Sequence, residues 1–167
     1  LSNYSFFTVA QQTGGQYLAE TTTAASGNFS LNQGTNGLYY LNSGDFLAGN
    51  SSTDIDITTW IFDAEATPNA QVRRDGTALA SDNNFAVMGL SNDFSVASRA
   101  TGESTADFEG DLSEFIIYKK PLNTAQQNIV ENYLSSKYGI AVNTDLYGYD
   151  GTYGADVVGI GQEADGQ

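Results

Sequence analysis

The sequence contains no cysteine and no histidine. Without cysteine the chain forms no disulfide and carries out no thiol chemistry, although this absence does not exclude secretion. Without histidine it lacks the commonest general base, the histidine of catalytic triads and the usual ligand of zinc sites. These absences exclude several large enzyme classes.

Basic residues are scarce. Six Lys and Arg stand against twenty Asp and Glu, which gives a formal net charge of -14 at pH 7. Such a surface repels phosphate backbones and anionic membranes, so we expect no nucleic-acid partner. It suits a salty medium or weak binding of Ca²⁺. Because the sequence has no long apolar run, we also expect no insertion into a membrane.

Proline occurs only twice, whereas glycine occurs 18 times. Together with many Asn, Ser and Thr, this composition is typical of short strands joined by turns. The 167 residues are 40% apolar, which is enough for one domain with a packed core. The chain begins at Leu1 with no signal-like segment, so we expect that processing removed one or that the chain is a piece of a longer protein.

Runs of apolar and aromatic residues predict the strands. The strongest candidates are residues 4–10, 55–62 and 112–118; weaker ones are residues 16–19, 29–31, 38–41, 70–74, 77–80 and 85–90. Asp75-Gly76 is a type I′ turn signal that predicts a hairpin, and Gly14-Gly15 predicts another hairpin turn. The polar residues 21–28, 42–53 and 91–106 are predicted to be loops.

One helix is predicted at about residues 123–138. Asn123 is a candidate N-cap, and Gln126 three residues later completes the amide form of a capping box. An apolar stripe follows, made by Ile129, Val130, Tyr133 and Leu134. Gly139 suits the left-handed position after the last turn. About nine short strands and one late helix predict an all-β fold, an antiparallel jelly-roll β-sandwich with the helix over one end or edge.

The segment from Phe108 to Ile140 resembles the closing segment of concanavalin A-like, laminin-G-like jelly-roll domains of bacterial surface proteins. In those domains a Gly-Asp-hydrophobic-x-Glu-hydrophobic strand leads through a turn into a helix that ends Tyr-Leu-x-x-Lys-Tyr-Gly. The matching residues are Gly110, Asp111, Glu114, Tyr118, Leu122, Tyr133, Leu134, Lys137, Tyr138 and Gly139. The hairpin Val72–Gly76 and the pair Met88-Gly89 are similar to other strands of the family.

The resemblance implies a concanavalin A-like domain over residues 1–140 and a Gly/Tyr/Asp-rich tail or linker over residues 141–167. Val157–Gly161 is similar to a segment that follows this domain in large secreted proteins of the Bacteroidetes type. A secreted or cell-surface location is therefore implied. Such domains have further strands before the one that corresponds to residues 4–10. Either the chain lacks them, or another segment completes the sandwich.

Three carboxylates form a candidate catalytic motif. Glu109-x-Asp111-x-x-Glu114 fits the E-x-D-x-x-E pattern of concanavalin A-like glycoside hydrolases, in which paired carboxylates act as nucleophile and general acid. Strand alternation puts Glu109 and Asp111 on one face, but Glu114 on the other unless a bulge intervenes. The alternative interpretation, which we favour, is that Asp111 and Glu114 bind backbone or basic groups at the sheet edge.

Two acidic groups are candidate Ca²⁺ ligands, because carboxylate oxygens are the ligands that Ca²⁺ prefers. The first consists of Asp145, Asp150 and Asp156 in a Gly-rich stretch. The second, weaker group consists of Asp45, Asp54 and Asp56; the last two would share a strand face and repel each other unless a cation lies between them. The alternative for each group is a solvated acidic loop.

Tyrosines are the candidate ligand-binding residues, since each combines a flat apolar face with a hydroxyl. They are Tyr39, Tyr40, Tyr147, Tyr149 and Tyr153. The last three either line a groove or fasten the tail to the sandwich. Trp60 and Phe62 could form a sugar-stacking platform, but we favour a place in the core.

These features favour a non-catalytic binding or adhesion module whose partner is a glycan or another surface protein, with Ca²⁺ as the one candidate cofactor. A second hypothesis is a structural spacer or subunit of a surface fibre, which self-associates by strand exchange. The third is a glycoside hydrolase that uses Glu109 and Glu114. Fold similarity alone does not decide among them.

Overall fold

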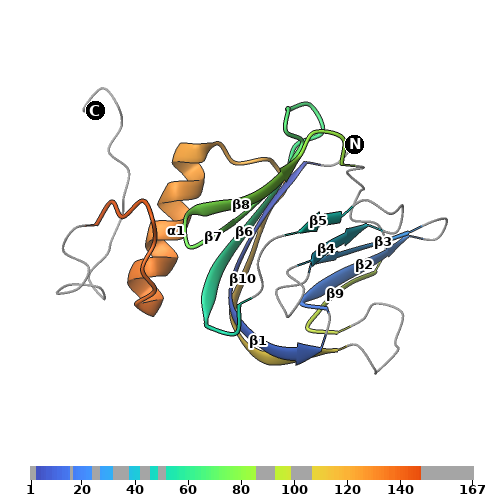
Figure 1. Ribbon diagram of the computed structural model, residues 1–167. Helices are drawn as coiled ribbons and strands as arrows, with labels where there is room; N and C mark the ends of the chain where they lie inside the picture. The colour runs from blue at the N-terminus through green and yellow to red at the C-terminus, as the bar shows by residue number, and fades with distance from the viewer. Residues whose placement is uncertain are drawn as a thin grey trace.

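The computed structural model describes residues 3–15, 17–23, 27–31, 38–41, 46–48, 52–85, 93–98 and 107–147, with side chains described except at residues 15, 22–23, 27–30, 38–41, 46–48 and 93. These ranges form ten strands and one α-helix. The strands make two antiparallel five-stranded sheets. Figure 1 shows the sheets facing each other, with the helix on the far side of one of them. The predicted jelly-roll-like β-sandwich with one helix is confirmed.

The first sheet has the strand order β10-β1-β6-β7-β8. Its strands are β1 (Tyr4–Gly15), β6 (Asp56–Phe62), β7 (Ala70–Arg74), β8 (Thr77–Asp82) and β10 (Phe108–Tyr118). The second sheet has the order β5-β4-β3-β2-β9. Its strands are β2 (Ala19–Thr23), β3 (Gly27–Leu31), β4 (Leu38–Leu41), β5 (Phe46–Ala48) and β9 (Asp93–Val96). In each sheet, strands that are distant in the sequence lie side by side.

The core between the two sheets is aromatic. Phe6 on β1 and Trp60 and Phe62 on β6 are at most 1% exposed. The rings of Phe6 and Phe62 meet edge to face, with their centroids 6.1 Å apart. Ala19 and Leu31 pack against them from the second sheet. The interpretation of Trp60 and Phe62 as core residues is therefore confirmed.

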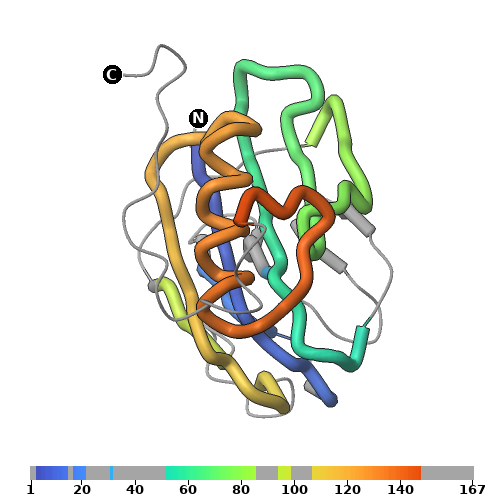
Figure 2. Tube along the Cα trace, turned by 90° about the vertical axis from the view of Figure 1, so that its left-hand side faces the viewer, coloured from blue at the N-terminus to red at the C-terminus, as the bar shows by residue number. Residues whose placement is uncertain are grey.

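The outer face of the first sheet is also apolar, and α1 (Thr124–Tyr138) covers it. Phe7, Val9 and Ile57 pack there against Leu122 and Leu134. In Figure 2 the helix lies in front of the strands of this sheet. The prediction that the helix lies over one end or edge is wrong. It covers a face, because all seven residues of β6 are buried and both faces of this sheet need a covering layer.

The ends of α1 agree with the sequence prediction. The Asn123 side chain accepts a hydrogen bond from the Gln126 backbone N–H at 2.9 Å, and the Gln126 side chain accepts one from the Asn123 N–H at 3.2 Å. Gly139 ends the helix in the left-handed conformation, with φ of 68°. In the described part of the chain, no helix has the length and apolarity that crossing a membrane requires.

The apolar stripe predicted for α1 is only partly right. Leu134 is buried as expected, but Ile129 and Tyr133 are 38% and 41% exposed. Gln127 and Glu131 are buried in their place, at 5% and 1% exposed. The helix therefore packs a largely polar face on the sheet, which requires polar partners there.

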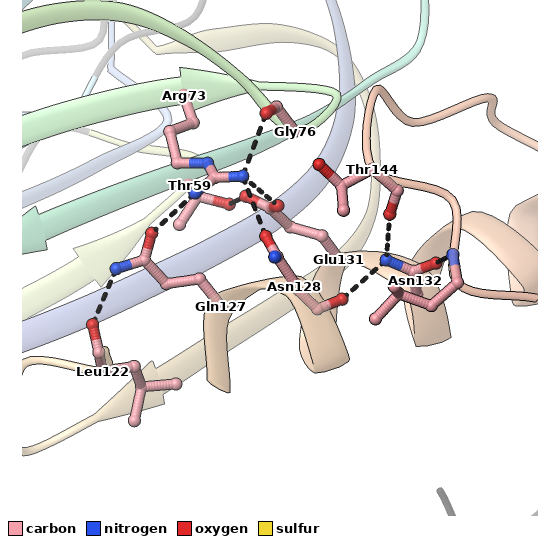
Figure 3. Close-up of polar contacts among 10 residues, drawn as sticks. Thr59, Arg73, Gly76, Leu122, Gln127, Asn128, Glu131, Asn132 and Thr144 are labelled. Carbon is pink, nitrogen blue, oxygen red and sulfur yellow. Dashed lines mark hydrogen bonds and ion pairs between the residues drawn. The ribbon is translucent and has the colours of Figure 1, made fainter. Parts of the chain in front are cut away.

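Arg73 on β7 is the centre of those polar contacts (Figure 3). Its guanidinium donates a hydrogen bond to Glu131 at 2.9 Å, and the two groups form an ion pair with side chains 12% and 2% exposed. The other oxygen of Glu131 accepts from the Thr59 hydroxyl at 2.8 Å. Arg73 also donates to Gln127, Asn128 and the carbonyl oxygen of Gly76. A buried charge pair in such a network holds the helix in one register on the sheet.

Several strand boundaries differ from the prediction. β1 continues through Gly14, where a hairpin turn was predicted, because two bulges keep it paired with β10. β5 and β9 lie inside predicted loops, and β2 lies mostly in the predicted loop of residues 21–28. These short strands depend on ladder partners that local sequence does not reveal. Residues 86–90 of the predicted strand 85–90 lie outside the described residues.

We predict that Glu131→Leu destabilises the fold by about 3–5 kcal/mol, because it leaves Arg73 buried without a counter-charge. The double variant Arg73→Met/Glu131→Leu should recover most of that loss, since neither charge is then buried alone. Chemical denaturation of the three proteins measures the effect. Lys137→Met, which breaks the exposed ion pair to Glu114, is the control and should cost much less. If Glu131→Leu and Lys137→Met lowered the free energy of unfolding equally, the buried Arg73–Glu131 pair would not be the contact that holds α1 on the sheet.

Gly110→Ala is expected to destabilise the fold by about 1–3 kcal/mol or more. The residue has φ of 145°, and an added Cβ would collide with the backbone carbonyl oxygen of Gln11. Gly139→Ala is the matched control: its φ is 68°, and nothing lies within 4 Å of an added Cβ. We expect it to cost only about 1 kcal/mol. Thermal melts that rank the two variants in the opposite order would refute this account.

Candidate functional site

The candidate catalytic carboxylates lie on β10, an edge strand of the first sheet. Val9 pairs with Glu114 and Ala10 with Leu112, so Ser113 is the extra residue of a bulge. The bulge moves Glu114 to the outer face, which Asp111 shares through its pairing with Gln11. Alternation along β10 also assigns Glu109 to this face.

Glu114 is engaged by the end of α1. Its carboxylate accepts hydrogen bonds from Lys137 Nζ and from the Tyr138 hydroxyl, each at 2.7 Å. Burial acts to raise the pKa of Glu114, but the hydrogen bonds from Lys137 and Tyr138 outweigh it and hold the pKa below its usual range. A carboxyl group with a lowered pKa is a poor general acid at neutral pH. For Glu114, the interpretation as a ligand of basic groups at the sheet edge is confirmed.

In the second acidic group, Asp56 lies beside a basic side chain. Asp56 is 5% exposed, and its carboxylate lies 3.7 Å from the Arg74 guanidinium. The Asp75 carboxylate accepts a hydrogen bond from the Ile57 N–H at 2.9 Å. Arg74 therefore places a positive charge beside Asp56. Asp54 is exposed, and Asp45 lies outside the described residues. Among those described, no group of three or more acidic side chains could hold a metal ion.

Burial also perturbs the carboxyl groups in this cluster. It raises the pKa of Asp75 to about 6, with help from the negative charge of Asp56. It raises the pKa of Asp56 as well, against hydrogen bonding from Ser52 and the attraction of Arg74. A carboxyl group that favours its neutral form in the folded state makes stability depend on pH.

Residues 139–147 fold back along α1 and are fastened at two places. The Asn143 N–H donates to the carbonyl oxygen of Asp75 in the β7–β8 turn at 2.8 Å. The Asn132 side chain donates to the Thr144 carbonyl oxygen at 2.7 Å and accepts from the Leu146 N–H at 2.5 Å (Figure 3). The chain is thus packed on the sandwich beyond residue 140, where the tail was predicted to begin.

A depression of about 260 Å³ lies where this segment leaves the helix. It is lined by Ser135, Ser136, Gly139, Ile140, Ala141, Val142 and Asp145. We call it the helix-end pocket. Its lining residues are aliphatic residues, a glycine, two buried serines and one aspartate. Sequence reasoning singled out Asp145 but missed the two serines, which read as ordinary helix residues.

Two predicted site residues, Asp145 and Tyr147, therefore lie close together beside α1. The Tyr147 N–H donates to the Asp145 carboxylate at 2.8 Å. The Tyr147 hydroxyl oxygen is buried and has no hydrogen-bond partner in the described part of the chain, and this burial raises its pKa. The other predicted tail residues, Asp150, Asp156, Tyr149 and Tyr153, lie outside the described residues.

Tyr39 and Tyr40 are in β4, where the backbone alone is described. Tyr40 pairs with Ser30 on β3, and Ser30 pairs with Glu20 on β2. Glu20 pairs in turn with Ser95 on β9. Tyr40 also pairs with Phe46 on β5, so it belongs to a row that crosses all five strands of the second sheet, and Tyr39 does not. Glu20, which is fully buried, was missed by sequence reasoning because a lone Glu in a polar stretch carries no signal.

Comparison with known proteins gives structural likeness only. No family model matches the chain, and no curated protein matches it significantly. Domain 4 of AbnA, an extracellular GH43 arabinanase from Geobacillus stearothermophilus solved with arabinotriose, matches with a TM-score of 0.60 and 18% identity over 78% of this chain and 68% of that one. The CBM40 of the Ruminococcus gnavus IT-sialidase, solved with α2,3-sialyllactose, matches with a TM-score of 0.58 and 14% identity over 78% and 83%.

A sialidase from Trypanosoma rangeli, in complex with 2,3-difluorosialic acid, matches with a TM-score of 0.50 and 15% identity. The match covers 82% of this chain but 24% of that one. At these identities the likeness establishes the fold, a β-sandwich that also occurs in these carbohydrate-related proteins. It assigns no residue a role.

We predict that Asp75→Asn changes how stability depends on pH. Because the folded-state pKa of Asp75 is raised to about 6, the folded protein binds more protons than the unfolded chain between about pH 4 and pH 6. The contribution of Asp75 to stability is therefore present at low pH and lost as the pH rises through this window. The Tm of the Asn variant minus that of the wild type should increase from pH 4 to pH 6 and stay constant above.

Asn is the appropriate replacement, because its amide oxygen can still accept from the Ile57 N–H and Asn tolerates the left-handed conformation at φ of 48°. Asp111→Asn, an exposed change on β10, is the control for a general effect of net charge. If Asp75→Asn and Asp111→Asn changed the pH dependence of the Tm in the same way, the burial of Asp75 would not be the cause of that change.

Proposed function

We propose that the chain is a non-catalytic, glycan-binding module. The observation that carries the proposal is the likeness of its sandwich to two domains that were each solved with a bound oligosaccharide, over 78% of this chain in each case. Because fold alone does not fix function, the proposal also needs a surface with suitable chemistry.

The helix-end pocket is the surface that we assign to the glycan. A sugar ring presents hydroxyl groups at its edge and C–H groups on its faces. Small-molecule sites combine apolar walls with a few well-placed polar groups. Ile140 and Val142 supply apolar wall here, while Ser135, Ser136 and Asp145 supply hydroxyl and carboxylate groups.

The state of the β10 carboxylates supports binding rather than hydrolysis. A retaining mechanism needs one carboxyl group as nucleophile and one as general acid. Glu114 is held as an anion by Lys137 and Tyr138, and Glu109 and Asp111 are exposed on an edge strand. We therefore assign these residues to the attachment of α1 and to the acidic surface.

The finer expectations are part of the same proposal. We propose that the module is secreted or at the cell surface, that it is of the concanavalin A-like type, and that it serves adhesion. A Ca²⁺ site formed by Asp145 with Asp150 and Asp156 is the competing assignment for Asp145, because a bound cation would replace the direct contact of this carboxylate with a sugar. We also propose that the chain after residue 147, rather than after residue 140, leads toward a following module, since residues 141–147 are packed against α1 and the β7–β8 turn.

A structural role is the second candidate, and one observation favours it. β10 is eleven residues long and stands at the edge of the first sheet, with β1 as its one partner among the described strands. A long edge strand can pair with a strand from another chain. Self-association through this edge would make the chain a subunit of a fibre.

Binding is tested by isothermal titration with a panel of neutral and acidic oligosaccharides. We expect at least one of them to bind saturably, to raise the Tm, and to shift NMR signals of residues 135–147. Asp145→Ala should weaken that binding by about tenfold or more, because it removes a charged hydrogen-bond acceptor. Glu65→Gln, in the exposed loop between β6 and β7, is the control. If no sugar binds while the chain assembles as its concentration rises, the structural role is favoured instead.

A further inference from the structure

The two bound oligosaccharides named above differ in charge. Arabinotriose is neutral, whereas sialyllactose carries a carboxylate. A site for an acidic sugar needs a positive group to balance that carboxylate, most effectively an arginine. The distribution of charge in this chain therefore distinguishes between the two classes of ligand.

The helix-end pocket is negative on two independent grounds. Asp145 contributes a carboxylate to its wall. The pocket also includes the last turn of α1, where the carbonyl ends of the peptide dipoles point outward. One of those carbonyl groups, at Ser135, is already occupied by the N–H groups of Gly139 and Ile140. The groups that remain accept hydrogen bonds and repel anions.

Three of the five described basic side chains are paired with carboxylates. Arg73 is paired with Glu131, Arg74 with Asp56, and Lys137 with Glu114. Lys119 and Lys120 are exposed, but they precede α1, and its fifteen residues separate them from the pocket. That helix is about 22 Å long at 1.5 Å per residue. Among the described basic residues, Lys137 alone belongs to the last turn of α1, and its ammonium group is bound to the Glu114 carboxylate at 2.7 Å, so no unpaired basic residue stands beside the pocket.

We propose that the helix-end pocket selects a neutral sugar residue and rejects acidic ones, with Asp145 as the discriminating group. This inference rests on the proposed function. The carboxylate of Asp145 accepts hydrogen bonds from sugar hydroxyls and faces a like charge when the ligand carries a uronic or sialic acid. Two like charges in contact weaken binding strongly, and added salt reduces their repulsion where the site is exposed.

The test compares ligands that are matched in size. Galactotriose and trigalacturonic acid form one pair, and 3′-galactosyllactose and α2,3-sialyllactose form the other. Isothermal titration at low salt should show at least about tenfold tighter binding of the neutral member. The ratio should fall toward one as the salt concentration rises to about 1 M, where the Debye length is about 3 Å.

Variants at position 145 separate the inference from the general proposal. Asp145→Asn keeps an oxygen that can accept from the Tyr147 N–H, so the local fold is preserved. It should reduce the ratio of the affinity for the neutral ligand to the affinity for the acidic ligand. Asp145→Lys should bring this ratio below one. Glu65→Gln should leave the ratio unchanged, because that residue lies in the β6–β7 loop and takes no part in the pocket.

Three outcomes of these titrations would lead to three different conclusions. Tight binding of an acidic member overturns the inference while the proposed glycan-binding function stands. A ratio that Asp145→Asn and Asp145→Lys leave unchanged overturns the assignment of Asp145. If neither class binds, the proposed function fails, and the inference fails with it. Circular dichroism spectra confirm that each variant is folded before its affinities are compared.

Discussion

The structure depends on a sheet whose central strands are apolar on both faces. On β1, Phe6 faces the second sheet and Phe7 faces α1, and both are fully buried. β6 is buried along its whole length. A strand of this kind needs a layer over each of its faces, because each Å² of apolar surface removed from water stabilises the fold by about 25 cal/mol. The second sheet is one layer, and α1 with the segment that follows it is the other.

The polar face of α1 follows from what the sheet presents to it. Arg73 lies on the outer face of β7, where the helix crosses, and burying its charge without a partner would cost several kcal/mol. The helix meets it with Glu131 and Gln127, which are buried, while Ile129 and Tyr133 face solvent. The helix is thus held by specific polar contacts as well as by Leu134. This is a more selective form of attachment than an apolar stripe, because the contacts are satisfied in one position only.

The features that were predicted correctly are those that depend on residues close together in the sequence. The capping box at Asn123, the Asp75-Gly76 turn and the long strands were all right, since each depends on a few neighbouring residues. The buried face of α1 was mispredicted, because it is set by Arg73, more than fifty residues away. Of the residues that line the helix-end pocket, Asp145 was singled out from the sequence, but nothing in the sequence indicates that Ser135 and Ser136 lie beside it. Their role depends on how residues 139–147 fold back.

The same few basic residues that hold the fold together also determine its surface. Three of the six, Arg73, Arg74 and Lys137, attach α1, the β7–β8 turn or the edge strand through carboxylates. These pairs neutralise three of the twenty acidic groups, so most of the remaining carboxylates give the surface its negative potential. A surface of this kind attracts hydrogen-bond donors and cations and repels anions. What the chain can bind is therefore constrained by the ion pairs that stabilise its fold.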